Sequence, residues 1–108
     1  MSLPISEHDI QKQILDWLDF THIFHRRQNV GAIASEYQGK KRFTRFGKAG
    51  DADIVLCYKG QFCAIEVKGE KGKQTQEQAC YQSDLESAGG RYILARSLED
   101  VKRGLGIA

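Results

Sequence analysis

The first part of the chain carries apolar residues at helical spacing. They recur at i, i+4, i+7 and i+8, which is the pattern of one buried helix face, and they are Ile10, Ile14, Trp17 and Leu18. Ser6 precedes this face as a good N-cap residue, and Asp9 follows it at the N3 position. The pattern therefore predicts an amphipathic helix over about residues 6–19, with Trp17 in its core-facing stripe.

Patterns rich in β-forming residues predict four strands in the middle of the chain. Two strong candidates, residues 52–58 and 61–68, are separated by Lys59-Gly60, a pair typical of a tight hairpin turn. Weaker alternation predicts strands at 23–29 and 42–46. The segment 31–39 between those two is expected to be a loop.

The last third of the chain predicts a helix, a strand and a second, shorter helix. Thr75 and Gln78 fit a capping box that opens a helix running to about residue 88, after a polar loop at 69–73. A strand follows at 92–96, and Ser97 begins the terminal helix. The helix between strands 61–68 and 92–96 predicts that these two strands are parallel.

This order of elements predicts one α/β domain over residues 1–108, with a mixed central sheet flanked by helices. The chain has 108 residues, 41 % of them hydrophobic and 28 % charged, which suits one folded domain and excludes disordered and collagen-like chains. The three cysteines lack zinc-site spacing, so we expect reduced and mostly buried thiols in a cytoplasmic protein. The sequence predicts neither a signal peptide nor a membrane span.

The predicted hairpin brings two carboxylates together. If Lys59-Gly60 is a two-residue turn, paired positions sum to 119, and Asp53 lies opposite Glu66 on one sheet face. Alternation along the second strand places Lys68 on that face as well. The same register places Cys57 and Cys63 on opposite faces, which argues against a disulfide between them.

Two facing carboxylates repel each other unless positive charge lies between them. A divalent cation such as Mg²⁺ is commonly held by one or two carboxylates, completed by water and a phosphate oxygen. Lys68 is placed to contact the attacking water or to stabilise negative charge on phosphate. The alternative interpretation is a surface salt bridge between Glu66 and Lys68, with Asp53 as a turn residue.

The motifs Gly50-Asp51-Ala52-Asp53-Ile54 and Ile65-Glu66-Val67-Lys68 resemble the Gly-x-x-Asp and Glu-x-Lys signature of the PD-(D/E)xK nuclease superfamily. With Ser6-Glu7-His8-Asp9-Ile10-Gln11 before them and Thr75-Gln76-Glu77-Gln78 after them, the chain more narrowly resembles the VRR-NUC (virus-type replication-repair nuclease) family over about residues 5–100. The resemblance implies a restriction-endonuclease-like α-β-β-β-α-β core.

The resemblance also implies roles for individual residues. Asp53 and Glu66 would bind Mg²⁺ or Mn²⁺ together with the Val67 carbonyl, and Lys68 would be the catalytic lysine. Ala52 stands where the superfamily often has proline, and Asp51 is a competing carboxylate. We assign the metal to Asp53 because the apolar run 54–56 after it fits a strand core.

Two further residues have both a functional and a structural interpretation. The resemblance implies that Glu7 lies near the metal, and helical spacing carries Glu7 to the rim of the buried face; alternatively, Glu7 favours the helix dipole. Gln78 would orient Lys68 or a phosphate, or it is only the capping box residue. Gln74 competes for the role of Gln78.

Basic residues gather in two places. Lys40, Lys41, Arg42, Arg45 and Lys48 fall within nine residues that contain no acid, with Phe43 and Phe46 among them. A second cluster is His25, Arg26 and Arg27, and Asn29 follows it. Such clusters suit a phosphate backbone, so we predict DNA contacts there, although a solvated surface hairpin has the same composition.

Several other residues favour structural roles. His22 and His25 lack a nucleophile to pair with, so surface or strand-edge histidines are the better interpretation. Tyr81 and Leu85 follow Gln78 at i+3 and i+7 and are predicted to pack in the core.

The leading hypothesis is a Mg²⁺- or Mn²⁺-dependent DNA endonuclease that hydrolyses phosphodiester bonds. The resemblance implies a homodimer that acts on branched DNA in the manner of Holliday-junction resolvases. It also allows a protein that is encoded by a virus or phage and acts in the host cell. The alternatives are a non-catalytic nucleic-acid-binding module, or a subunit of a larger replication, repair or restriction complex. The net charge of +2 keeps the subunit hypothesis open.

Overall fold

The structure is a computed structural model that describes residues 4–28, 31–37, 39–46 and 48–107. Its helices are α1 (Glu7–Phe20), α2 (Gln76–Ser87) and α3 (Leu98–Gly104). Its strands are β1 (His25–Arg27), β2 (Gly31–Tyr37), β3 (Lys40–Phe46), β4 (Ile54–Tyr58), β5 (Gln61–Val67) and β6 (Arg91–Ala95). None of the described helices has the length and apolar content needed to cross a bilayer.

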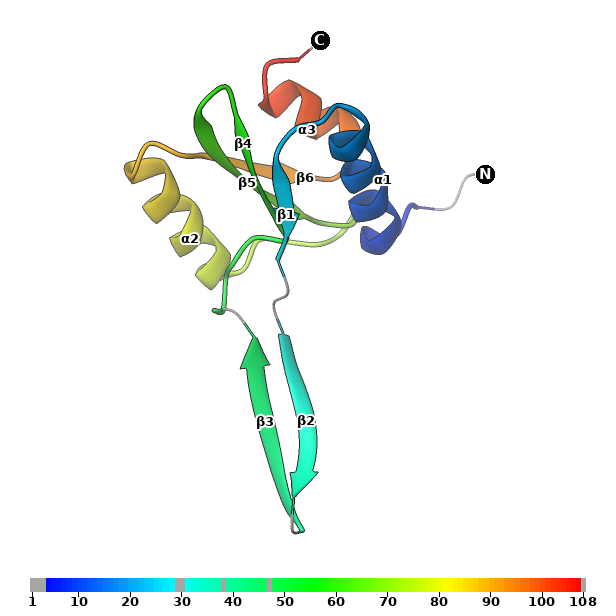
Figure 1. Cartoon of the computed structure of the whole chain (residues 1–108), viewed down its shortest axis with the longest axis vertical. Coiled ribbons are helices and arrows are strands. Elements are labelled where there is room, and N and C mark those ends of the chain that lie inside the picture. Colours follow the sequence, from blue (N-terminus) through cyan, green and yellow to red (C-terminus); the bar gives the residue numbers. More distant parts are fainter. Residues whose placement is uncertain (1–3, 29–30, 38, 47, 108) are drawn as a thin grey trace.

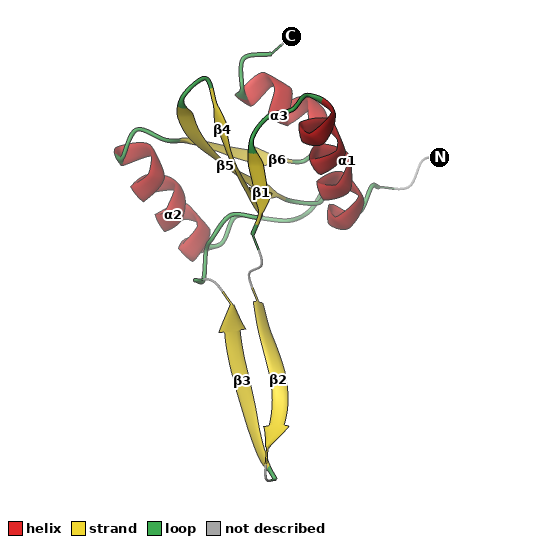
Figure 2. Cartoon of the chain, viewed as in Figure 1, coloured by secondary structure: helices red, strands yellow, loops and turns green. Residues whose placement is uncertain are grey.

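Four strands form a mixed central sheet in the order β1-β4-β5-β6 (Figure 2). The β1–β4 and β4–β5 pairs are antiparallel, and β5–β6 is parallel, as the crossover through α2 predicted. Helices α1 and α3 lie on one side of this sheet and α2 lies on the other (Figure 1). The mixed α/β class with a sheet flanked by helices is therefore confirmed.

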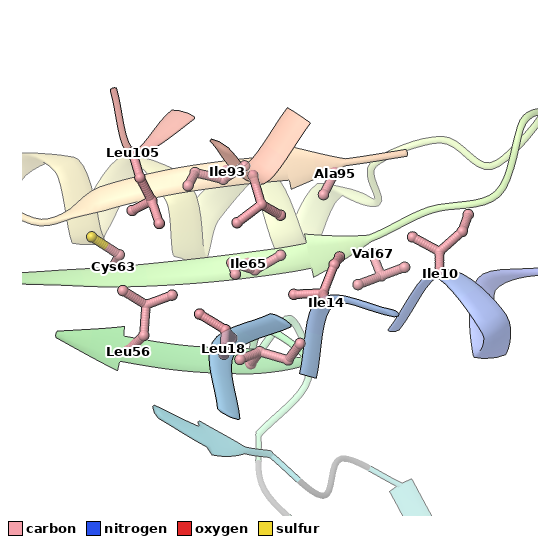
Figure 3. Close-up of a cluster of buried hydrophobic side chains, with 12 residues drawn as sticks. Ile10, Ile14, Leu18, Leu56, Cys63, Ile65, Val67, Ile93, Ala95 and Leu105 are labelled. Carbon is pink, nitrogen blue, oxygen red and sulfur yellow. The ribbon is translucent and has the colours of Figure 1, made fainter. Parts of the chain in front are cut away.

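The larger core cluster lies between the sheet and α1 with α3. Ile10, Ile14 and Leu18 are its contribution from α1, which confirms the helical spacing, and Trp17 packs against the cluster while only partly buried. Figure 3 shows the three α1 side chains, Ile10, Ile14 and Leu18, meeting those of Leu56, Cys63, Ile65, Val67, Ile93, Ala95 and Leu105. Alternate residues of β4 and β5 therefore face α1, as the predicted register requires.

The opposite sheet face is covered by α2 through a smaller cluster. Ala52, Ala64 and Tyr92 are buried there, and Tyr81 and Leu85 of α2 pack on them, which confirms the core role predicted for both. The face that carries Ala64 also carries Glu66, two residues further along β5. The N-terminal end of α2 therefore lies over the sheet end that holds the candidate acids.

The β4–β5 turn has the predicted geometry. Lys59 and Gly60 both have positive φ, 51° and 79°, as a type I′ turn requires. The turn pairs Tyr58 with Gln61, and the register continues to Ile54 opposite Ile65, so every pair sums to 119. Cys57 and Cys63 are free thiols on opposite faces.

The loop predicted at residues 31–39 is wrong for residues 31–37, which form β2. This strand pairs along its whole length with β3, and the two make a separate sheet outside the central one. The β2 sequence alternates too weakly to predict a strand, because this strand forms through its pairing with β3. Gly39 lies in the turn between the two strands, with a φ of 73°. The predicted strand at 42–46 begins two residues earlier, at Lys40.

Other expectations need smaller corrections. The strand expected over 23–29 is limited to His25–Arg27, and Asn29 lies outside the described residues. The strand expected from residue 52 begins at Ile54, because the chain before it turns away toward α2. The cysteines are not mostly buried, since Cys63 is buried but Cys57 and Cys80 are exposed.

Gly50 fixes the approach of the chain to α2. It has a φ of 91°, and a Cβ added there would overlap the backbone carbonyl of Glu77, at 2.7 Å from its carbon. Neither the conformation nor the space admits another residue. Gly50 therefore allows the chain to pass close to α2 three residues before Asp53.

We expect Gly50→Ala to be strongly destabilising. Gly89→Ala is the matched control, because Gly89 has φ 92° but open space at its Cβ position. The control should cost roughly 1–2 kcal/mol for left-handed strain alone, and Gly50→Ala roughly 2 kcal/mol more, in chemical denaturation. Equal costs for both variants would contradict the close packing.

Candidate functional site

Asp53 stands where β4 separates from β5. The ladder between these strands ends at Ile54 opposite Ile65, so Asp53 lies one step beyond it. There the Asp53 Oδ2 accepts a hydrogen bond from the Val67 backbone N–H at 2.8 Å. The carboxylate takes the place of the next backbone partner, which holds it at the strand end that also carries Glu66.

Glu66 is the one buried charged residue among those described, with 4 % of its surface exposed. Its Oε1 accepts a hydrogen bond from Gln78 Nε2 at 2.8 Å and lies 3.9 Å from Lys68 Nζ. Its Oε2 is buried and receives no hydrogen bond from a donor group in the described part of the chain; the Asp53 carboxylate beside it can be its partner only when one of the two acids is protonated. An unpartnered carboxylate oxygen inside a fold is costly, which marks this atom as a place for a proton or a cation.

The two acids disfavour each other's charge. Burial and then repulsion from Asp53 raise the pKa of Glu66 to about 8, against the partial relief that Lys68 provides. Burial also raises the pKa of Asp53, although the Val67 N–H bond acts in the other direction. A divalent cation between the two groups would remove both penalties.

Gln78 serves both interpretations at once. Its Oε1 accepts from the Thr75 backbone N–H at 2.9 Å and the Thr75 hydroxyl accepts from Gln78 N–H, which completes the predicted capping box. The other end of the same amide, Nε2, is the donor to Glu66. The cap therefore fixes which atom of Gln78 faces the acid.

Glu7 closes the site from α1. Its Oε1 accepts a hydrogen bond from the Gly69 backbone N–H at 3.1 Å, directly after Lys68. A Cβ on Gly72 would lie 3.3 Å from Glu7 Oε1 and 3.2 Å from Lys68 Cδ, so this loop wraps both side chains. Glu7 also adds to the repulsion that raises the pKa of Asp53 and Glu66.

Asp51 does not join the acids. Its Oδ2 accepts from the Lys48 backbone N–H at 2.9 Å, within a turn against α2. There it lines a hollow of about 330 Å³ together with Lys48, Ala49, Gln76, Glu77, Cys80, Tyr81 and Asp84. Asp51 therefore lies in a turn against α2, whereas Asp53 lies beside Glu66.

Three other candidates lie apart from Glu66. Gln74 donates from Nε2 to Gln82 Oε1 at 2.8 Å, so it does not take the position of Gln78. His25 is bound on both ring nitrogens, by the Ile23 carbonyl oxygen at 2.7 Å and by Asp19 at 3.1 Å. His22 is exposed in the turn after α1.

Most of the basic residues predicted to contact DNA lie on β1 and β3. Arg26 is exposed on β1, with its guanidinium 4.6 Å from the centre of the Phe24 ring, and Arg27 is exposed beside it. Lys40 and Lys48 are exposed near the ends of the β3 segment. Lys41, Arg42 and Arg45 lie on β3, outside the central sheet.

Two residues that the sequence does not single out support the site. The Gln28 N–H donates to the Asp53 carbonyl at 2.7 Å, which continues the β1–β4 register in which paired positions sum to 81. Arg96 Nη1 donates to the carbonyl of Gly69. Predicting that β1 pairs with β4 would have placed Gln28 opposite Asp53. No sequence pattern indicated the contact made by Arg96.

Within the described residues, no group of three or more His, Cys, Asp or Glu side chains is close enough to hold a metal by itself. The two carboxylates that meet at this site are those of Asp53 and Glu66. Comparison with known proteins adds no assignment, because no protein-family model and no curated protein matches the chain.

Proposed function

We propose that this chain is a metal-dependent DNA endonuclease that hydrolyses phosphodiester bonds with Mg²⁺ or Mn²⁺. The observation that carries the proposal is the buried Glu66 carboxylate, one oxygen of which receives no hydrogen bond from a donor group and has the second acid, Asp53, next to it. Lys68 adds an ammonium 3.9 Å from the same carboxylate. A purely structural acid would have both oxygens satisfied, or would lie in solvent.

The donor set fits a hard cation. Asp53 keeps Oδ1 for a ligand while Oδ2 is bound to Val67 N–H, and Glu66 keeps Oε2 while Oε1 is bound to Gln78. We infer that the Val67 carbonyl is a further ligand and that Glu7 acts nearby, directly or through water. Two carboxylates completed by water and phosphate oxygens are a usual Mg²⁺ arrangement.

When bound there, the ion supplies positive charge that acidifies water and neutralises phosphate. The chain's own residues would then act in distinct ways. Lys68 stabilises the negative charge that develops on the phosphate, or holds the attacking water. Gln78 keeps the Glu66 carboxylate oriented, and Glu7 holds the loop that begins at Gly69 over the site.

We propose DNA as the substrate because basic residues lie on β1, which ends beside Asp53, and along β3, which extends away from the site. Arg26, Arg27, Lys40 and Lys48 are exposed, and Lys41, Arg42 and Arg45 add charge on β3. We include Asn29 on the ground of its sequence position. The likeness to VRR-NUC nucleases adds a preference for branched DNA and a homodimer whose two sites face symmetric strands.

The deciding experiment incubates the purified chain with synthetic four-way junctions and matched linear duplexes. We expect cutting with Mg²⁺ or Mn²⁺, none with EDTA, and faster cutting of the junction. Light scattering on the same sample should give twice the mass of one chain. Salt-sensitive binding without cutting under any metal would instead support a non-catalytic binding module or a subunit of a larger complex.

Gln78 and Thr75 separate helix capping from metal binding. We expect Thr75→Ala to cost about 1 kcal/mol of stability with unchanged metal affinity. Gln78→Ala should cost about as much and also weaken Mn²⁺ binding about 10- to 100-fold, because Glu66 loses the donor that orients it. Calorimetric titration with Mn²⁺ measures this, and equal affinities in the two variants would contradict the positioning role.

A further inference from the structure

The β2–β3 hairpin, residues 31–46, is a two-stranded ribbon that forms a sheet separate from the central one. Among the elements that the structure describes, each strand of this hairpin packs extensively only against the other, and Figure 1 shows the pair projecting away from the central sheet. An isolated two-stranded hairpin is marginally stable in water, so such a projection indicates a surface that completes it. We call this ribbon the arm.

The arm leaves the sheet at the end that carries the candidate acids. β1 ends at Arg27, and the next residue, Gln28, donates its N–H to the carbonyl of Asp53. The other strand of the arm returns to β4 through Gly50 and Ala52. Seven-residue strands at roughly 3.4 Å per residue reach about 24 Å from this point.

Charge on the arm is strongly one-sided. The arm carries Lys40, Lys41, Arg42 and Arg45, and its one acid, Glu36, is paired opposite Lys41. Alternation along β3 places Lys41 and Arg45 on one face of the ribbon, and Lys40 and Arg42 on the other. Positive charge on both faces suits a ribbon with phosphates on both sides, not one lying flat on a surface.

We propose that the arm enters the major groove of the duplex that flanks the cleaved phosphate. The major groove is about 12 Å wide, admits a two-stranded β-ribbon, and has a phosphate backbone along each wall. A reach of about 24 Å corresponds to about seven base pairs at 3.4 Å per pair. This inference rests on the proposed function, and it adds that the enzyme needs about seven base pairs of duplex on one side of its cut for full activity.

The test is a series of substrates whose duplex on either side of the cut ranges from about 3 to about 14 base pairs. For the full chain, binding and cutting should rise with length on one side up to about seven pairs and then level off. Replacing residues 32–45 by a short glycine-serine linker should remove this dependence and leave the rate seen on the shortest duplex. A rate independent of flank length in the full chain would overturn the proposal.

Charge substitutions give a second measurement that does not need cutting. Lys41→Gln with Arg42→Gln removes one positive charge from each face, and Lys12→Gln with Lys59→Gln removes two exposed charges from the core domain. Fluorescence anisotropy should show about tenfold weaker duplex binding for the arm variant, and a salt slope smaller by about 1.8, with the control unchanged.

The same measurements separate failure of the arm from failure of the proposed function. If the chain cuts no substrate but its DNA binding shows the arm-dependent salt slope, the proposal for the arm is supported and the proposed nuclease function is wrong. If the chain cuts normally but the arm and control variants bind DNA identically, the proposal for the arm is wrong and the nuclease function stands. If the linker variant changes from dimer to monomer in light scattering while its flank-length dependence persists, the arm is a contact between copies and the groove assignment is wrong.

Discussion

Replacing Lys68 by methionine should lower kcat on a four-way junction by about 10²- to 10³-fold at saturating Mn²⁺. The Lys68 ammonium lies 3.9 Å from the Glu66 carboxylate and the Lys68 side chain is only 13 % exposed, so water cannot replace its charge efficiently. Methionine keeps the aliphatic stem that packs near Gly72 and removes only the charged end. The loss should therefore fall on kcat while the fold is retained.

Lys71→Met is the matched control, because Lys71 is an exposed lysine in the loop that follows. It should cut within about twofold of the unchanged chain, a difference of well under 1 kcal/mol. Single-turnover rates at several Mn²⁺ concentrations distinguish a chemical defect from weaker metal binding. If Lys68→Met cuts at the control rate, Lys68 is a salt-bridge partner of Glu66 and has no catalytic role.

Local chemistry made most of the central fold predictable. Ser6, Thr75 and Ser97 each cap the helix they were expected to open, because each hydroxyl accepts a hydrogen bond from the backbone N–H three residues further along. The Lys59-Gly60 turn fixed the register of β4 and β5, and a register fixes the face of every residue in the pair. Strand ends were less predictable, since they depend on where neighbouring elements pull the chain away.

Strand β2 was missed for a physical reason, whereas the strand predicted at 42–46 lies within β3. β2 and β3 form a two-stranded sheet separate from the central one, so packing against the central core does not impose alternation on β2. Their pairing is visible only once the turn at Gly39 joins them. Because this ribbon lies outside the central sheet, its basic residues are informative about a partner.

The candidate site was predictable in composition but not in detail. Asp53 and Glu66 were expected to face each other across an intact ladder, whereas β4 has already separated and Asp53 binds the Val67 N–H instead. The two roles of Gln78 could not be foreseen together, because the amide's two ends serve different neighbours. The binding of Asp51 by the Lys48 N–H depends on a turn that the sequence left undefined.

The metal-free protein should lose stability as pH rises from about 4.5 to about 8. The pKa of Glu66 is near 8 in the folded chain against an ordinary value of 4.5, so the folded state holds a proton that the unfolded chain has released. Unfolding free energy then falls by up to 1.4 kcal/mol per pH unit across that window and levels off above it. Asp53, whose pKa is also raised, adds to the fall.

Mg²⁺ or Mn²⁺ should reverse this trend, because binding requires the deprotonated carboxylates. Affinity should rise about tenfold per pH unit below pH 8, and thermal shifts with metal should grow in parallel. Glu66→Gln should be as stable as the unchanged chain at pH 5, more stable than it at pH 8 without metal, and unresponsive to Mn²⁺. The neutral amide keeps the shape while removing the buried charge.

Glu70→Gln is the control, since Glu70 is an exposed acid in the loop beyond Lys68 and should change neither the pH profile nor the metal response. Urea denaturation across pH 4.5–9, with EDTA and with Mn²⁺, gives both profiles in one series. A metal-free chain whose stability is flat over this range would mean that Glu66 is charged at neutral pH without an ion. A chain that Mn²⁺ does not stabilise at pH 8 would remove the cation from the site, and with it the reason for keeping two acids at one strand end.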